Sequence, residues 1–510
     1  MKAEDFREDY QIFNEAAQKF FAKELKPAEF KGTSGGFGSY AQRGAESVML
    51  RLRMAGGRAT KERLRFISKS IRQYHISLMH FTTCQAIQFH NLDLEAVTAL
   101  ATEALDYNII TRGGGGDNPR NVMVSPLSGV EMGEYFDVLP YAEAAGEYML
   151  GFIRTRKFPR KYKCCFSNSP ANRPHATFRD LGFTANPDGT FDVYSAGGLG
   201  PNWKKGVKVG EHVKPEKVLY YIEAMADMFV SYGNYESRAR ARSRYMQDVL
   251  GDSYAEKFRE KLDAVIASGR DLDIHAEAAE ISKKGDGTTA KGPRVIPQKQ
   301  NGLYTVVYHP LGGCPDPMRF ADLADAVVEI EGSEIRIDPE ESCYIINLTG
   351  AEAEKILAMT EDSEVSEFGC SVACIGSSIC QQGVRDSQAL LKAIQDASRE
   401  WDFSAEYLPK LHISGCPSSC GTHQIGRIGF RGAAKKAEGA MQPAFVLFVN
   451  GNDRQGEERF GEEIGTILQT EIPSFVHDLG LALAEAGEDF DTWYEKNRDA
   501  FMAIAGKYTA

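Results

Sequence analysis

The sequence predicts an α+β protein made of two homologous halves. Stretches that alternate like strands are followed by stretches with apolar residues at helical spacing. The same order of segments returns about 255 residues further along the chain. A polar, glycine-containing stretch at residues 283–293 separates the two copies and is typical of a linker. A duplicated chain of this kind offers a cleft for a large cofactor.

The elements of the first half follow from spacing and turn residues. Residues 1–30 read as a helical arm of mixed charge, and residues 47–54 alternate as a strand that ends in a Gly-Gly pair. A helix is expected from Thr60. Residues 75–89 suggest a second strand, and residues 93–105 a second helix that is capped by its aspartate.

The second half repeats these signals at a steady offset. Residues 304–313 again form a predicted strand that ends in Gly-Gly. Similar offsets across four segments are hard to produce by chance. The matched pairs are Gly57 and Gly313, Asn91 and Asn347, Pro159 and Pro409, and Gly197 and Gly451.

Composition suits a globular protein of several domains and argues against some functions. Of the 510 residues, 43% are hydrophobic and 25% are charged. No apolar run approaches the ~18 residues of a membrane-spanning helix, and the charged N-terminus lacks the apolar core of a signal peptide. The net charge of −12 argues against a nucleic-acid-binding surface. We therefore expect a cytoplasmic protein in which an anionic substrate needs a local basic pocket.

Half of the ten cysteines fall within residues 370–420, among glycine and serine rather than in an apolar run. Two pairs, Cys-x5-Cys and Cys-x3-Cys, supply the four thiolates that a four-iron cluster needs. Zinc is the alternative, although structural zinc pairs have two to four residues between cysteines. Small buried thiols explain one such cysteine easily and four poorly.

The cysteine pattern, with Ser-Gly-Cys-Pro at the start of the last pair, resembles that of the sirohaem-dependent nitrite/sulfite reductase haemoprotein family. The resemblance implies a 4Fe–4S cluster bound by Cys374, Cys380, Cys416 and Cys420. It also implies that Cys420 bridges to the iron of sirohaem. Cys370, expected one helical turn before Cys374, could compete as a ligand but is interpreted as a packing residue.

Basic residues concentrate in the first half, where paired cysteines are missing, and we expect them at places that correspond to the cysteine motifs. Arg51 and Arg53 alternate with apolar residues, so both should share one face of their strand. Residues 113–121 form a flexible glycine-rich loop that carries an arginine, and residues 158–165 form a strand with lysines two apart. An oxyanion needs several fixed cations, because one exposed ion pair contributes only about 0–1 kcal/mol. Taken alone, each segment is more often part of an ordinary charged surface or a simple turn.

The resemblance extends to these segments and assigns roles. It implies that the substrate anion is bound by Arg51, Arg120, Lys161 and Lys163. It places Asn118 and Asn121 beside sirohaem, and Gly197 and Gly198 where the backbone approaches the macrocycle. Sirohaem carboxylates are assigned to Thr83, Gln85 and Gln88. Here the chain departs from the family, which commonly has arginine where this sequence has Cys84, so one expected carboxylate contact is lost.

The reaction implied is the six-electron reduction of sulfite to sulfide at sirohaem coupled to the cluster, and Lys163 favours sulfite over nitrite. Reduction of nitrite to ammonia is the alternative, and a non-catalytic iron–sulfur scaffold is the alternative from another class. No nucleotide-binding glycine motif is present, so electrons should come from ferredoxin or a flavoprotein subunit. The arginines of residues 238–244 could dock an acidic ferredoxin, or could equally pair with carboxylates.

The resemblance also implies the layout of the chain. Two ferredoxin-like half-domains should pair, and two sulfite-reductase-haemoprotein-like α/β domains should flank a central cofactor cleft. The expected boundaries are an arm at 1–30, half-domain 1 at 31–108, the sirohaem and substrate domain at 109–280, a linker at 281–300, half-domain 2 at 301–362 and the cluster domain at 363–510.

Overall fold

The computed structural model describes residues 1–276 and 278–509. The chain forms two compact units. The first unit comprises residues 1–198, 202–308 and 315–361, and the second comprises residues 199–201, 309–314 and 362–510. No helix of the described residues is both long enough and apolar enough to cross a membrane.

The first unit contains two copies of one β-α-β-β-α motif. The first copy consists of β2 (Val48–Arg53), α3 (Lys61–Gln73), β4 (Leu78–Phe81), β5 (Ala86–Leu92) and α4 (Leu94–Glu103). The second consists of β12 (Tyr304–Tyr308), α10 (Pro317–Glu329), β13 (Glu334–Ile337), β14 (Cys343–Leu348) and α11 (Gly350–Met359). Val48 and Tyr304 begin the two copies, 256 residues apart, and Lys61 and Pro317 keep the same spacing. The predicted duplication is confirmed at the level of whole elements.

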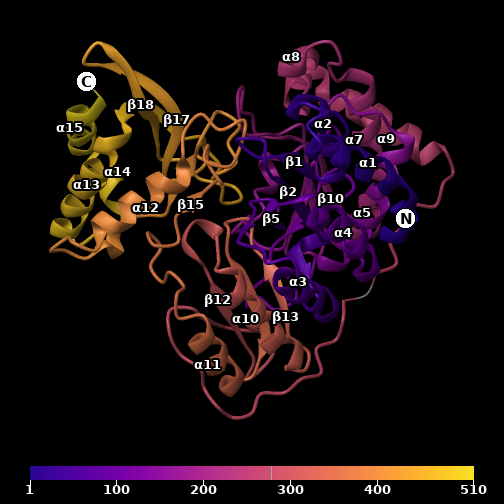
Figure 1. Cartoon of the computed structure of the whole chain (residues 1–510), viewed down its shortest axis with the longest axis horizontal. Coiled ribbons are helices and arrows are strands. Elements are labelled where there is room, and N and C mark those ends of the chain that lie inside the picture. The colour runs from indigo at the N-terminus through magenta and orange to yellow at the C-terminus, as the bar shows by residue number, and fades with distance from the viewer. Residues whose placement is uncertain (277, 510) are drawn as a thin grey trace. The chain divides into compact units, whose positions relative to one another are not determined.

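The two copies pair, as predicted. Helices α3 and α10 pack against each other (Figure 1), and the ring centroids of Phe81 and Phe320 lie 5.3 Å apart in the shared core. The sheets have the orders β1-β2-β5-β4 and β11-β12-β14-β13-β3, with β1 at Ser39–Ala41 and β11 at Val295–Pro297. Strand β3 (Arg58–Ala59) comes from the first copy but pairs antiparallel with β13 of the second. The halves therefore share one sheet as well as one core.

Two larger domains repeat a second motif. In the first unit the sheet order is β10-β9-β8-β7-β6, and in the second unit it is β15-β16-β17-β18-β19. In both sheets the first two pairings along the chain are parallel and the last two antiparallel. The strands are β6 (Met123–Val124), β7 (Cys164–Ser167), β8 (Leu181–Ala185), β9 (Phe191–Ser195), β10 (Val207–Val213), β15 (Val372–Ala373), β16 (Leu411–Ser414), β17 (Ile428–Ala437), β18 (Ala440–Val449) and β19 (Glu462–Leu468).

Helices cover these two sheets and form the N-terminal arm. In the second unit, α13 and α15 pack together, and Figure 1 shows them with α14 beside the sheet that contains β17 and β18. The helices are α1 (Tyr10–Phe21), α2 (Pro27–Ser34), α5 (Leu139–Leu150), α6 (Phe152–Thr155), α7 (Val218–Tyr232), α8 (Met246–Leu250), α9 (Tyr254–Ala267), α12 (Ser387–Ser398), α13 (Ile472–Ala486), α14 (Phe490–Lys496) and α15 (Arg498–Thr509).

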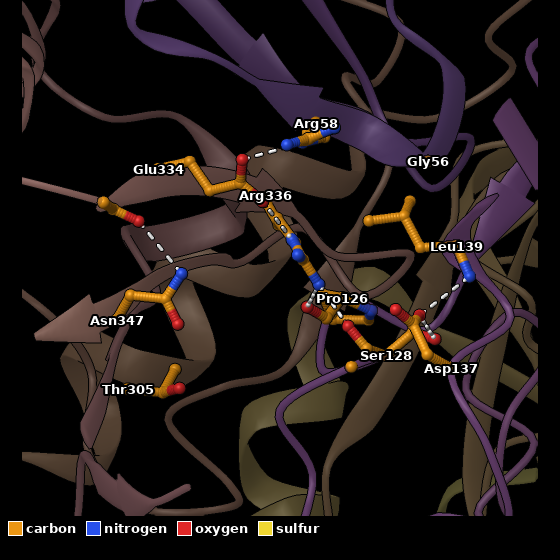
Figure 2. Close-up of polar contacts among 12 residues, drawn as sticks. Gly56, Arg58, Pro126, Ser128, Asp137, Leu139, Thr305, Glu334, Arg336 and Asn347 are labelled. Atoms are coloured by element: carbon orange, nitrogen blue, oxygen red, sulfur yellow. Dashed lines mark hydrogen bonds and ion pairs between the residues drawn. The ribbon is translucent and has the colours of Figure 1, made fainter. Parts of the chain in front are cut away.

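A polar network within the first unit ties the paired half-domains to the adjacent larger domain (Figure 2). Glu334 on β13 accepts from Arg58 Nε and Arg336 Nε, each at 2.7 Å. Arg336 Nη1 donates onward to the carbonyls of Pro126, at 3.2 Å, and Ser128. Burial alone would raise the pKa of Glu334, but the two guanidinium groups outweigh it and lower that pKa. Charge pairing therefore compensates the burial of this carboxylate.

The structure corrects two predicted elements. Residues 75–89 do not form one strand, because a tight turn at residues 82–85 separates β4 from β5. In that turn Gln85 N donates to Thr82 O at 2.8 Å, and Gln85 adopts a positive φ of 53°. Residues 158–163 precede strand β7 rather than belonging to it, apart from a single bridge at Tyr162.

Candidate active site

The glycine-rich loop at residues 113–121, called the glycine loop below, is tightly held rather than flexible. Buried Arg53 donates to the carbonyls of Arg112 and Pro119 at 3.2 Å and to that of Arg120 at 3.0 Å. A Cβ at position 115 would lie 2.3 Å from the Tyr40 hydroxyl, so only glycine fits there. Arg53, predicted to share a face with Arg51, thus fixes the loop backbone.

Arg51 and Arg120 are brought together by that loop. Both guanidinium groups donate to the carbonyl oxygen of Gly114, and Arg120 Nη2 also donates to Gly116 O at 2.7 Å. Tyr40 lies beside them and accepts a hydrogen bond from Gly116 N at 3.0 Å. Burial would raise the pKa of Tyr40, but Arg120 and Arg51 lower it overall. The four cations Arg51, Arg120, Lys161 and Lys163 are called the cation cluster below.

The two lysines of the cluster are placed by a backbone bridge. Arg120 N donates to Tyr162 O at 2.8 Å, and Tyr162 N to Asn118 O at 3.3 Å, so the glycine loop runs parallel to this stretch. The Tyr162 ring is buried, and its hydroxyl donates to Ile222 O. Because side chains of extended backbone alternate, Lys161 and Lys163 share the opposite side.

Lys163 forms a specific pair with Cys84. Lys163 Nζ lies 3.2 Å from Cys84 Sγ, at the tip of the β4–β5 turn. Burial would raise the pKa of Cys84, but Lys163, Arg179 and Arg51 together lower it to about 6. Burial lowers the pKa of Lys163, against the opposing influence of Cys84. Near neutral pH Cys84 is therefore a thiolate, and the amine of Lys163 is the group in contact with it.

Positive charge around the cluster exceeds the buried negative charge that contacts it. Burial and the neighbouring Arg120 lower the pKa of Arg53 to about 9, and burial lowers the pKa of Arg120 and that of Arg244 to about 10. The buried carboxylate here, Asp180, accepts from Arg242 Nη2 at 3.1 Å and from Lys163 N at 2.9 Å. Such crowding of cations fits a site for polyanions.

The residues assigned to sirohaem contacts are mostly engaged with the backbone. Gln85 is buried, and its amide contacts Val124 N and O at 2.8 Å and Ile337 O at 2.7 Å, so it holds the turn rather than offering a free donor. Asn121 Nδ2 donates to Gln85 O at 3.0 Å and Asn118 Nδ2 to Gly115 O at 3.2 Å. These three amides hold the backbone of the β4–β5 turn and of the glycine loop in place.

The remaining residues assigned to sirohaem contacts have other surroundings than these three amides. Gln88 lies between Arg51 and His90; with its oxygen toward the guanidinium, it accepts from Arg51 Nε at 3.0 Å. Thr83 is half-buried at the turn next to Cys84. A Cβ at Gly197 would lie 2.8 Å from Arg179 O, and one at Gly198 would lie 3.3 Å from Arg244 Nη1, so both glycines allow close packing.

In the second unit, the cysteine motifs follow two adjacent parallel strands. Cys374 follows β15, and Cys416 lies just past the end of β16. Since the carboxyl ends of parallel strands meet at one edge, both motifs lie at that edge of the sheet. Cys374 Sγ accepts from Gly415 N at 3.2 Å and lies 3.1 Å from Ser387 Oγ. Burial and the nearby Cys420 raise the pKa of Cys374 to about 12.

The cysteine motifs of the second unit do not occupy positions equivalent to those of the cations in the first unit. Arg120 and Lys163 precede β6 and β7, whereas Cys374 and Cys416 follow β15 and β16, so the two repeats use opposite ends of equivalent strands. Cys370 is also placed differently from the prediction, because strand β15 rather than a helical turn separates it from Cys374.

The cysteines are unbridged, as cluster ligands must be. Within the described residues, no three His, Cys, Asp or Glu side chains form a group able to hold a metal ion. A 4Fe–4S cluster instead distributes four thiolates over separate iron atoms, and backbone N–H groups aimed at sulfur suit thiolate ligands.

Two polar residues follow Cys420 in the chain, His423 and Arg427. His423 is buried against Phe448, and burial lowers its pKa to about 3. Arg427 pairs with Glu367 and Asp491.

The arginines of residues 238–244 are largely occupied, which favours the carboxylate-paired interpretation of that segment. Arg238 and Arg160 both bind Asp117 of the glycine loop, at 2.8 and 2.9 Å. Arg242 binds Asp180, and Arg244 is buried. Sequence reasoning missed Tyr40, Arg179 and Asp180, since each reaches the site from a segment without a recognisable motif.

A duplicated chain with a crowded cation site in one repeat and two cysteine motifs at one sheet edge in the other is typical of a cofactor-dependent oxidoreductase. The family model of the nitrite and sulphite reductase 4Fe-4S domain matches residues 115–267. That of the nitrite/sulfite reductase ferredoxin-like half domain matches residues 40–107.

Similar proteins agree with these matches. The chloroplastic ferredoxin–nitrite reductase of Zea mays is 28% identical over 424 residues, covering 79% of this chain and 73% of the relative. Sulfite reductase [ferredoxin] 1 of Mycolicibacterium paratuberculosis is 23% identical over 469 residues, covering 88% and 82%. The structure of the Mycobacterium tuberculosis NirA protein superposes with a TM-score of 0.80 at 24% identity, covering 98% of this chain and 95% of that one, which shows the same fold.

This chain belongs to the sirohaem-dependent nitrite and sulfite reductase family. It is an oxidoreductase, and its cofactors are sirohaem and a 4Fe–4S cluster. The residues present fit both groups: the buried cations suit a polycarboxylate macrocycle, and the cysteines, which form no disulfide bonds, suit iron.

The Cys84–Lys163 pair makes a first testable prediction. In cofactor-free protein, iodoacetamide should alkylate Cys84 with a pH midpoint near 6 rather than near the ~8.5 of a free cysteine, because the thiolate is the nucleophile. The rate should rise as the pH rises through the midpoint, and mass spectrometry of the labelled peptide measures it. Lys163→Met should move the midpoint upward. A wild-type midpoint near 8.5 would contradict the pairing.

Proposed function

We propose that this chain reduces sulfite to sulfide in a six-electron reaction at sirohaem, using the cation cluster as its anion site. The observation that carries the proposal is the convergence of Arg51 and Arg120 on one carbonyl oxygen beside Lys163. Guanidinium groups fixed in this way bind the oxygens of a small oxyanion with defined geometry. Because they are positioned before substrate arrives, they stabilise charge that develops as oxygen is removed.

The lysines are proposed as proton donors, since an arginine is effectively never deprotonated. Lys163 suits this role because burial lowers its pKa toward the working range of a general acid. Cys84 Sγ, 3.2 Å from Nζ, can keep the ammonium form populated between turnovers. Sirohaem, when bound, supplies the iron at which the oxyanion is reduced.

In the second unit, Cys374, Cys380, Cys416 and Cys420 are proposed as the cluster ligands, with Cys420 as the bridging thiolate. Support comes from the placement of both motifs at one sheet edge and from the Gly415 N–H that faces Cys374 Sγ. Thr83, Gln88, Gly197 and Gly198 are proposed to contact sirohaem directly, while Gln85, Asn118 and Asn121 hold the backbone around it.

Nitrite reduction to ammonia is the second candidate. The substrate preference for sulfite rests on Lys163, whereas several similar proteins are named ferredoxin–nitrite reductases. Those names also support ferredoxin as the electron donor, ahead of a flavoprotein subunit. Ten cysteines in 510 residues, half of them clustered, suit metal chemistry in a reducing compartment, and we propose a cytoplasmic location.

The proposal is tested by anaerobic reconstitution with sirohaem and iron, followed by turnover with reduced methyl viologen. We expect haem absorption bands and a higher kcat/KM for sulfite than for nitrite. The reverse preference would retain the cation cluster and exclude Lys163 as the discriminator. Absence of haem bands after reconstitution would refute the reductase proposal and leave an iron–sulfur scaffold.

A further inference from the structure

Arg179 is a buried arginine that the reaction proposed above does not use. It follows the short turn at residues 176–178, and only 6% of its surface is exposed. Its Nε donates to Pro174 O at 3.0 Å, but buried Nη2 has no hydrogen-bond partner within the described residues. An interior guanidinium nitrogen without a partner is unfavourable, because its N–H groups have lost water and gained nothing in exchange.

The surroundings of Arg179 are those of the candidate active site. Arg179 acts with Lys163 to lower the pKa of Cys84, and it acts against protonation of Lys163, so its charge lies close to both side chains. Its backbone lies directly against Gly197, where a Cβ would be 2.8 Å from Arg179 O. Arg179 therefore adjoins both the cation cluster and a glycine assigned to the macrocycle.

The neighbouring carboxylate does not neutralise Arg179. Asp180 is committed to Arg242 Nη2 at 3.1 Å, to Lys163 N at 2.9 Å and to the hydroxyl of Ser243. Residue 179 has extended backbone angles, φ −112° and ψ 170°, and successive side chains of an extended chain point to opposite sides. The Arg179 guanidinium thus lies on the side of Cys84 and the Lys163 side chain, whereas the Asp180 carboxylate is turned to Arg242, Ser243 and the backbone of Lys163.

We propose that Arg179 binds an anionic oxygen, of a cofactor carboxylate or of the oxyanion substrate, in the place that Cys84 leaves open. The resemblance predicts an arginine at position 84, and a guanidinium from a different segment reaches the same neighbourhood. Arg179, just before β8, thus supplies the positive charge that an arginine at position 84 would have placed in the β4–β5 turn. This inference rests on the proposed function, since it takes the cation cluster as an anion site.

Two variants and one control test the inference. Arg179→Met removes the guanidinium, and the double variant Cys84→Arg/Arg179→Met returns a guanidinium to the turn. Arg240→Met, at an exposed arginine, is the control. Cofactor-free protein is titrated with sirohaem and followed by visible absorption. Arg179→Met should raise the Kd about tenfold or more, as expected for a lost charge-assisted hydrogen bond, and the double variant should recover most of the loss.

A second measurement separates the two sources of the anion. If the Kd for sirohaem is unchanged but KM for sulfite and nitrite rises about tenfold at constant kcat, Arg179 binds substrate. Either result supports the inference. Unchanged Kd and KM in a folded Arg179→Met protein would overturn it. If that variant does not fold, Arg179→Lys, which loses the fork but keeps the charge, is measured instead, and wild-type constants there would overturn it.

The wild-type titration separates failure of this inference from failure of the proposed function. Wild-type protein that takes up no sirohaem would refute the proposed function and the inference together. Wild-type uptake with no effect at position 179 refutes the inference alone.

Discussion

Replacing Lys163 by methionine is expected to lower kcat for the oxyanion about 100- to 10,000-fold while sirohaem and iron contents stay at wild-type levels. Methionine keeps the apolar stem and removes the ammonium group that contacts Cys84 Sγ at 3.2 Å. Loss of a general acid acts on the chemical step, so kcat should fall more than KM rises. Steady-state kinetics on reconstituted protein and the haem spectrum measure the two effects separately.

Matched lysines of the same segment serve as comparisons. Lys161→Met should also lower turnover, because Lys161 lies two residues away on the same side of the chain. Lys157→Met, six residues before Lys163 and exposed, should behave like wild type. Wild-type turnover in both Lys161→Met and Lys163→Met would remove the proposed proton-donor role. Loss of sirohaem in Lys163→Met would instead mean that Lys163 is needed to bind the cofactor.

Replacing Cys374 by alanine should abolish the 4Fe–4S cluster and reduce turnover to background. Cys374 is a half-buried residue whose Sγ is approached by Gly415 N and Ser387 Oγ, and its high pKa without metal means that bound iron must displace the proton. Iron and acid-labile sulfide per chain measure the loss directly. Because the second unit loses its metal centre, its unfolding midpoint should also fall.

Cys370→Ala is the control for this experiment. Cys370 lies four residues before Cys374, is half-buried, and is separated from it by strand β15. Iron content should therefore stay near the wild-type value. Wild-type iron in Cys374→Ala together with loss of iron in Cys370→Ala would show that the ligand set has been assigned to the wrong cysteine.

The sequence was sufficient for features that depend on local periodicity. Helix α3 begins at Lys61, after its expected start at Thr60, and Asp93 caps α4 by accepting from Ala96 N at 2.8 Å. The β4–β5 turn was not predicted, because its Thr-Thr-Cys-Gln sequence lacks the glycine or proline that usually marks a turn. The tight packing of the glycine loop was also hidden, because Tyr40 and Arg53 constrain it from outside.

The residues of the candidate site likewise divide into those that the sequence pointed to and those that it did not. Arg51, Arg120, Lys161 and Lys163 stand in short motifs, so the sequence pointed to all four. Arg179 stands in no such motif, and its role depends on which distant residues the fold leaves without counter-charge. Buried charge balance is a property of three-dimensional neighbours, and a linear pattern cannot report it.

Strand β3 has a consequence for how the two halves of this enzyme can be exchanged or cut. Arg58 and Ala59 belong to the first half by chain order but complete the sheet of the second half, and Arg58 also forms the ion pair with Glu334. A hybrid can join the first half of one relative to the second half of another. Its two halves must then be compatible where β3 pairs with β13, and not only at the linker. A chain cut within residues 283–293 would still be held together by the pairing of β3 with β13, as two fragments that share one sheet and one core.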